Sequence, residues 1–278
     1  MKFKETEEYD LLIPYIDLDL LNEIFRTTMH KYGVAEVPTI DPGEFELFDW
    51  IAPLSYLVDT DEVFVNPDKL IDILEGLHVP VAATVLSHIL LHEQTHRVSK
   101  GELQTRTIQE GQKTIHVTER ISGYSRSEIR ESGDESEGQK WFEIFNEGVT
   151  ETIARAMFDQ YTQAFGVPRE VVEELHRLTG RDANSEHNNR FNVEVADTVA
   201  ETLALDAGVS KQEMWRAIVM GALRGDKLDE PETREWLNSS VDSHDFVERL
   251  RDLEMYQDEV NKIVKEMREA QKRKRALR

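Results

Sequence analysis

The stretch His92-Glu93-Gln94-Thr95-His96 decides how the rest of this sequence is interpreted. Residues four apart on an α-helix lie one above the other on the same face, so the imidazoles of His92 and His96 can reach one ion together. Zinc favours such nitrogen ligands, at about 2.0–2.1 Å. Glu93 points about 100° around the helix, so it is poorly placed as a ligand but can accept a proton from a water molecule on the ion. The motif therefore predicts a zinc site with Glu93 as its general base.

The residues around the motif indicate a buried helix that runs from Pro80 to about Ser99 and is ended by Gly101. Its apolar residues include Val85, Leu86, Ile89, Leu90 and Leu91. Buried histidines need partners, and a metal ion supplies them. The alternative is an amphipathic helix with incidental histidines, because the motif alone is only moderately specific. His88 lies one turn before His92, where packing or a hydrogen bond is favoured over ligation.

A second motif, Asn146-Glu147-Gly148-Val149-Thr150-Glu151, falls in a long helix expected from about Gln139 to Phe165. Zinc hydrolases use three protein ligands and leave one position for water, so a third ligand should exist. Glu147 is the best candidate, because a carboxylate among apolar neighbours is costly unless it is paired or bound to metal. Glu151 falls one turn later on the same face and could fix the tautomer of a ligand histidine.

Together the two motifs resemble those of the gluzincin metallopeptidases, a superfamily that includes thermolysin-like and aminopeptidase-N-like enzymes. The resemblance covers roughly residues 60 to 165 and implies a zincin-like fold. It implies that Glu147 is the third zinc ligand, that Glu151 orients the first histidine and that Glu93 is the general base. Fifty residues separate His96 from Glu147, more than in those two families, so the subfamily is not identified.

The expected reaction is hydrolysis of peptide bonds with one zinc ion per chain. Zinc lowers the pKa of its bound water towards about 7 and polarises the scissile carbonyl. Glu93 takes the proton and later delivers it to the leaving amine. Such a site also needs a donor for the oxyanion. Tyr124 and His187 are preferred over Tyr161 and His244, with an ordinary structural or surface role as the alternative for each.

Ahead of the first motif, the sequence predicts a helix and several strands. The spacing of apolar residues predicts a helix from Asp17 to Lys31, ended by Gly33. The expected strands are Val34 to Ile40, Trp50 to Tyr56 and Glu62 to Val65. Asn66 is expected to cap a helix that ends near Gly76. In the fold that the resemblance implies, Glu62 to Val65 would form the rim of the cleft and pair with an extended substrate, with an ordinary strand as the alternative.

Beyond the first motif, Leu103 to Ile108 and Thr114 to Ile121 are expected to form a β-hairpin around Glu110-Gly111. The polar, acidic stretch Ser127 to Gly138 predicts a mobile loop. The helices expected after residue 166 are Pro168 to Leu178, Phe191 to Leu205, Lys211 to Leu223 and Ser243 to about Lys272. The basic cluster 272–275 is expected to be a solvated helix C-terminus, where cations complement the dipole, and a binding tail is the alternative.

These elements predict an α+β protein. A zincin-like catalytic part with a small mixed β-sheet and the active-site helices is expected over residues 1–166. An all-helical C-terminal part is expected over residues 167–278, with the cleft near the junction.

Composition restricts the partners. The net charge is −22 over 278 residues, which disfavours nucleic acid and anionic membranes and leaves a peptide or protein substrate as the expected partner. There are no cysteines, so any metal must use His, Asp or Glu. The N-terminus lacks the apolar core of a signal peptide, and no run approaches the ~18 apolar residues of a membrane span. We therefore expect a soluble, cytoplasmic protein, and its oligomeric state is left open.

Three hypotheses follow. The first is an active zinc metallopeptidase, which the intact core positions of both motifs favour. The second is a catalytically silent zinc-binding regulatory or scaffold protein on a peptidase-like fold. The third is a helical interaction protein that binds no metal. Bound zinc separates the first two hypotheses from the third, and peptide cleavage separates the first from the second.

Overall fold

The computed structural model describes residues 12–47, 54–57, 62–66, 77–111, 113–133, 135–172, 190–254 and 256–277. Contacts within the chain divide it into two units. Unit 1 comprises Met1–Val98 and Thr152–Asn188, and unit 2 comprises Ser99–Glu151 and Asn189–Arg278. The division into units does not test whether residues 1–166 and 167–278 form separate domains, so the boundary at residue 166 stays a prediction. Both units contain helices and strands, which confirms the predicted α+β class.

In unit 1 the first long helix is α2 (Leu18–Lys31), as the sequence predicts. The Asp17 side chain caps it by accepting a hydrogen bond from the Leu20 N–H at 3.0 Å, which satisfies one of the unpaired donors of the first turn. The Asp17 N–H donates to the Tyr161 hydroxyl at 3.0 Å. Tyr161 belongs to the C-terminal half of α5 (Glu143–Phe165), so this bond ties the start of α2 to α5.

The helix α4 (Val79–Val98) carries the first motif and confirms the predicted buried helix. Its buried apolar residues include Val81, Ala82, Ala83, Leu86, Leu90 and Leu91. They lie on several sides of the helix, and a helix that is apolar all round is stable only when it is surrounded by protein. Polar side chains within it bond to their own helix, as Thr95 does to the Leu91 carbonyl at 2.7 Å. Packing therefore holds the two histidines on a rigid support.

A small mixed sheet completes unit 1, with strands in the order β1-β3-β2. β1 (Glu46–Leu47) runs parallel to β3 (Glu62–Val65), and β2 (Leu54–Leu57) runs antiparallel to β3. The prediction that a free edge of Glu62 to Val65 pairs with a substrate is wrong at Phe64 and Val65, because β1 pairs with them on one side and β2 on the other. Among the described strands, β2 is the edge strand on one side of β3.

The predicted strand Val34 to Ile40 is wrong, because the structure assigns no strand there. Ile40 instead exchanges two hydrogen bonds with the Asn22 side chain of α2, at 2.7 and 3.0 Å. The carbonyl of Val34 bonds to the His30 ring at 2.8 Å. The backbone groups of Val34 and Ile40 thus bond to side chains of α2 and not to a neighbouring strand. The predicted helix from Asn66 to Gly76 lies outside the described residues after Asn66.

Two short 3-10 helices complete the description of unit 1, η1 (Ile13–Tyr15) and η2 (Pro42–Glu44). The strand predicted from Trp50 to Tyr56 is described only from Leu54 onwards, where it forms β2. Of the helix predicted from Pro168 to Leu178, residues 169–172 are helical and the rest lies outside the described residues.

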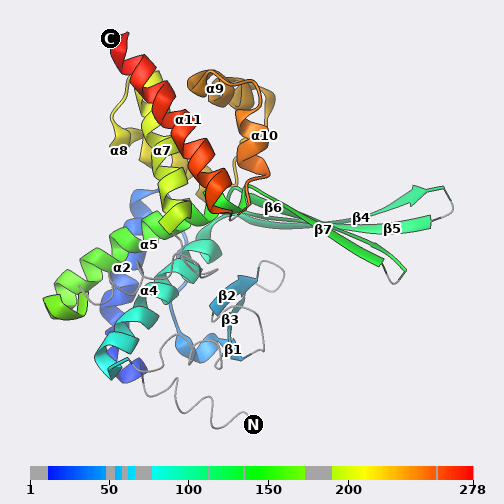
Figure 1. The fold of residues 1–278 in the computed structure, drawn as a ribbon. Coiled ribbons are helices and arrows are strands. Elements are labelled where there is room, and N and C mark those ends of the chain that lie inside the picture. Colours follow the sequence, from blue (N-terminus) through cyan, green and yellow to red (C-terminus); the bar gives the residue numbers. More distant parts are fainter. Residues whose placement is uncertain are drawn as a thin grey trace. The chain divides into compact units, whose positions relative to one another are not determined.

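Unit 2 contains a long four-stranded antiparallel sheet in the order β4-β5-β6-β7 (Figure 1). Its strands are β4 (Gly101–Glu110), β5 (Lys113–Ser122), β6 (Ser125–Ser132) and β7 (Glu135–Trp141). The predicted hairpin is confirmed as β4 and β5. The predicted mobile loop, Ser127 to Gly138, is wrong: its residues form β6 and β7.

Ion pairs help to explain why the polar residues of β6 form a strand. Arg106 contacts Glu119 at 2.7 Å and Glu128 at 3.2 Å, so it links three strands. Arg130 donates to Glu128 at 2.8 Å, and this bond, with the nearby charge of Arg106, holds the pKa of Glu128 below its usual value. Paired charges and the backbone ladder stabilise this sheet. Ile115 and Val117 of β5 are buried, whereas most residues of β4 and β7 are exposed.

Besides the start of α5, the described residues of unit 2 form five helices: α7 (Arg190–Ala207), α8 (Lys211–Arg224), α9 (Pro231–Val241), α10 (Phe246–Arg251) and α11 (Gln257–Ala276). The predicted helices Phe191 to Leu205 and Lys211 to Leu223 are confirmed as α7 and α8. The single helix predicted from Ser243 to Lys272 is wrong, because the chain breaks between α10 and α11. No glycine or proline marks that break, and α9 was not predicted although Pro231 provides a helix start.

The basic end of α11 packs against the acidic side of α7, and the two helices run side by side (Figure 1). Arg268 pairs with Glu194, Arg275 with Glu201, and Lys274 with Asp206. Burial raises the pKa of Asp206, but hydrogen bonds from Lys274 and other donors outweigh burial and lower the pKa overall. The cluster predicted as a solvated C-terminus therefore contributes to helix packing. Among the described residues, no helix combines the length and apolar character needed to cross a bilayer.

Candidate metal centre

His92, His96 and Glu147 form a cluster that could hold a metal ion. Each residue offers one ligand atom, and these atoms all lie within 4.8 Å of one another. The two histidines come from α4 and the glutamate from α5. In the described part of the chain this is the only group of at least three His, Cys, Asp or Glu residues that meets the condition. The cluster contains the three residues predicted as ligands.

The geometry of the histidine pair fits a tetrahedral ion. The Nε2 atoms of His92 and His96 lie 3.1 Å apart, with the ring planes at 71°. Two nitrogens at about 2.0–2.1 Å from a tetrahedral ion would be roughly 3.3–3.4 Å apart, so only a small adjustment is needed. His92 is 8% exposed, so its imidazole is largely removed from water. Two imidazoles and one carboxylate are a donor set that zinc commonly takes in hydrolases.

Glu93 is not part of the cluster and contacts the small sheet of unit 1. Its Oε2 atom accepts a hydrogen bond from the backbone N–H of Tyr56 in β2, at 2.9 Å. This agrees with the expectation that its direction around the helix makes it a poor ligand. The bond holds the carboxylate in a defined position one residue after His92.

The same hydrogen bond shows which way β2 faces. In an antiparallel pair, the N–H and C=O groups of alternate residues point toward the partner strand, and those of the residues between point away. Because the Tyr56 N–H reaches Glu93, Tyr56 points away from β3. The outer edge of β2 therefore faces the carboxylate of Glu93, and no described strand pairs with that edge. Sequence reasoning missed Tyr56, because backbone groups leave no signature in a sequence.

Glu147 stands in the second turn of α5, and the start of that helix is unusual. The helix was expected from Gln139 but begins at Glu143, because residues 135–141 pair as β7. Phe142 makes the turn with a φ of 57°, which is costly for a bulky side chain, by about 1–3 kcal/mol. Its N–H donates to the Arg251 carbonyl at 2.8 Å. These contacts fix where α5 begins, and therefore also the position of Glu147 in its second turn.

Asn146 has a structural role that the sequence did not reveal. Its Oδ1 atom accepts a hydrogen bond from the Tyr124 N–H at 2.9 Å, in the turn between β5 and β6. Asn146 is 3% exposed and lies next to Glu147. The asparagine of the second motif thus connects α5 to the base of the four-stranded sheet.

Gly148 allows α7 to approach α5 closely. An added Cβ at this position would overlap the backbone carbonyl of Asn192 in α7. We predict that Gly148→Ala lowers the free energy of unfolding by about 1–3 kcal/mol, since neither backbone can move easily. The variant should also bind metal more weakly, because Glu147 is the preceding residue. Urea unfolding and zinc titration check both effects.

Gly138→Ala is the matched control, because a Cβ there would meet nothing within 4 Å. We expect it to unfold and to bind zinc as the unmodified protein does. Equal stability of the two variants would show that the α5–α7 contact is looser than the structure describes.

The remaining predicted site residues are placed as follows. Tyr124 is buried, and its hydroxyl donates to the Ile218 carbonyl at 2.7 Å. Burial raises the pKa of this hydroxyl, and the charge of Asp226 raises it further. The hydroxyl is thus engaged within unit 2, and an oxyanion role for Tyr124 stays a prediction without structural support. His187 lies outside the described residues.

Four further residues complete the comparison with the sequence. Glu151 is buried one turn after Glu147, as expected for a residue that supports the site, and its bond to a histidine stays a prediction. His88 packs against the Phe158 ring, with centroids 5.1 Å apart, which agrees with a packing role. Of the other oxyanion candidates, Tyr161 accepts the Asp17 N–H, and His244 is exposed near α9.

Comparisons of this chain with protein-family models, with curated proteins and with solved structures returned no match. The functional argument therefore depends on the cluster and on the residues around it.

Proposed function

We propose that this protein is a zinc-dependent metallopeptidase of the gluzincin type. The observation that carries the proposal is the cluster of His92, His96 and Glu147, with Glu93 held beside it by a backbone hydrogen bond. Two imidazoles and a carboxylate would hold the zinc ion. When bound, the ion supplies Lewis-acid chemistry, which activates water and polarises a carbonyl group.

The protein's own residues would move the proton. Glu93 has one carboxylate oxygen, Oε2, fixed by the Tyr56 N–H. We assign its other oxygen, Oε1, to take the proton of the attacking water and to return it to the leaving amine. Because the backbone of β2 fixes the carboxylate, little reorientation is needed when the proton moves.

The sheet of unit 1 supports a peptide substrate. Because the outer edge of β2 faces Glu93, an extended peptide that paired with this edge would pass next to the proposed general base. Such pairing uses backbone hydrogen bonds and is a common way for proteins to bind extended peptides. The net charge of −22 also disfavours nucleic acid as a substrate.

The test combines metal analysis and a peptide library on the purified full chain. We expect about one zinc ion per chain under zinc-replete conditions, and cleavage of some library peptides. Absence of bound metal would refute both zinc hypotheses. Bound zinc without cleavage across a broad library would refute the peptidase and favour the silent scaffold.

A further inference from the structure

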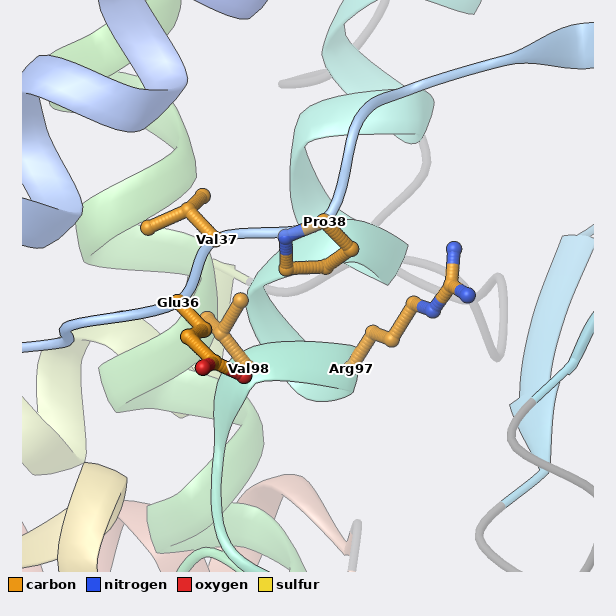
Figure 2. Close-up of a pocket in the computed structure, with 5 residues that line it drawn as sticks. All are labelled: Glu36, Val37, Pro38, Arg97 and Val98. Carbon is orange, nitrogen blue, oxygen red and sulfur yellow. The ribbon is translucent and has the colours of Figure 1, made fainter.

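A hollow in unit 1 and a strand edge in unit 2 are both open to another molecule. The hollow lies at the end of α4, where the segment 36–38 crosses the last turn of the helix (Figure 2). It has a volume of about 380 Å³ and is lined by Glu36, Val37, Pro38, Arg97 and Val98. Arg97 already interacts within the chain, so its guanidinium is not free to bind a ligand there. The strand edge is different, because it presents backbone groups that have no partner.

This edge belongs to β4, which is the first strand of the four-stranded sheet and pairs with β5 without a bulge. Two residues separate Glu110 from Lys113, and a turn of this length is closed by a hydrogen-bonded pair. Hydrogen-bonded pairs then recur at every second residue, so the even-numbered residues of β4 bond to β5. The bond from the Gly123 N–H to the Lys100 carbonyl, at 3.2 Å, agrees with this alternation. The odd-numbered residues of β4 therefore direct their N–H and C=O groups away from the sheet.

Within the part of the chain that the structure describes, nothing pairs with these outward groups. An open edge is a template for another strand, and natural proteins often protect it with a bulge, a proline or a covering segment. β4 has neither a bulge nor a proline. The side chains of its odd-numbered residues are uncharged and exposed, and Leu103 among them is 43% exposed. The charged side chains of β4 lie on the opposite face, so they decide which strand can pair with this edge.

We propose that the outer edge of β4 pairs with β4 of a second copy of this chain. The two strands run antiparallel about a two-fold axis at Thr105, which gives the self-complementary contact of a symmetric dimer. The outward residues of both strands then form about ten backbone hydrogen bonds, a number typical of specific interfaces. This inference goes beyond the proposed function and does not depend on it.

The charges of β4 select this register. Two registers pair nine residues of each strand, one centred on Thr105 and one centred on Arg106. The register centred on Arg106 opposes this residue to its own copy and Glu102 to Glu110, and like charges directly opposite one another are destabilising. The register centred on Thr105 opposes no like charges. In it Glu102, Arg106 and Glu110 lie opposite Ile108, Gln104 and Lys100 of the second copy.

The charge of the whole sheet also favours contact between two copies here. The chain has a net charge of −22, whereas residues 99–141 contain seven Lys or Arg and eight Asp or Glu, so this region is nearly neutral. Two copies therefore meet at the sheet with less repulsion than at a surface of average charge. At the axis Thr105 faces its own copy, and cross-strand pairs of threonine are favourable.

Sedimentation equilibrium of the full chain tests the proposal, at concentrations from about 1 to 100 μM, where micromolar dissociation constants are measurable. We expect a monomer–dimer equilibrium. Thr105→Pro removes an outward N–H that only the dimer uses, and it does so twice, so dimerisation should weaken about 100-fold. Proline is tolerated at an edge where the N–H faces solvent, so the variant should fold, which circular dichroism checks.

Ser136→Pro is the matched control on β7, the opposite edge of the sheet. Ser136 follows the pair of Ser132 with Glu135, which closes the turn between β6 and β7, so its N–H also points outward. We expect this variant to dimerise as the unmodified protein does.

Thr105→Glu and Thr107→Glu test the register, because both add one negative charge to the same edge and face of β4. In the proposed dimer, the carboxylate at position 105 lies opposite its own copy, and that at position 107 lies opposite Leu103 of the second copy. Thr105→Glu should therefore weaken dimerisation about fivefold more than Thr107→Glu. A chain that stays monomeric throughout the concentration range, a dimer that Thr105→Pro leaves intact, or equal weakening by the two glutamate variants would each overturn the inference.

Discussion

Replacing Glu93 by glutamine is expected to lower peptide cleavage by about 10²–10⁴-fold while zinc is retained. The carboxylate accepts the proton in the proposed reaction, and an amide cannot. The amide oxygen of glutamine can still accept the Tyr56 N–H, so the side chain should keep its position. Zinc should stay bound because Glu93 is not a member of the ligand cluster. Kinetics on a library peptide and metal analysis of the same sample measure both outcomes.

Glu23→Gln is the matched control, because it removes one exposed carboxylate from α2. It should cleave the peptide at the rate of the unmodified protein. Unchanged cleavage by Glu93→Gln would refute Glu93 as the base. Loss of zinc from that variant would show that Glu93 also takes part in holding the metal.

Replacing His92 by alanine is expected to weaken zinc binding more than about 100-fold. Loss of a residue that only supports a ligand typically costs 10–100-fold in affinity, and loss of a ligand should cost more. The Nε2 atom of His92 lies 3.1 Å from that of His96, so its removal leaves two ligands in the cluster. Equilibrium dialysis against a zinc buffer measures the affinity, and circular dichroism reports whether the helices persist.

His88→Ala is the control for that experiment. His88 is on the same helix one turn earlier, but its ring packs against Phe158. It should lose some stability and keep its zinc. If His88→Ala loses zinc as His92→Ala does, the assignment of ligands along α4 is wrong.

Local rules predicted the parts of the site that lie on one helix. The i, i+4 spacing of His92 and His96 places them on one face without further information, and the structure puts their Nε2 atoms 3.1 Å apart. Glu147 was predicted because its surroundings make an unpaired carboxylate costly, and it joins the cluster. Both predictions depend only on neighbouring residues within one helix, and these neighbours can be identified directly from the sequence.

Contacts between distant segments were not predictable in this way. The hydrogen bond from the Tyr56 N–H to Glu93 involves a backbone group, which any residue type would provide. The strands β6 and β7 lack the alternation of apolar and polar residues. Ion pairs to Glu128 help to hold β6, and backbone pairing holds β7 against β6. A polar composition is typical of loops as well, so this stretch was assigned as a loop. The order of the small sheet likewise depends on pairing, which placed β2 and not β3 at the edge.

The anchoring of α5 has a consequence for the order in which the site matures during synthesis. A chain leaves the ribosome from its N-terminus, so α4 and its two histidines emerge early. The start of α5, which carries Glu147, is held by the hydrogen bond from the Phe142 N–H to the Arg251 carbonyl. The close approach of Gly148 to the Asn192 carbonyl also holds it. Both partners are made long after the histidines. We therefore expect the proposed metal cluster to reach its final arrangement only after residue 251 has been made.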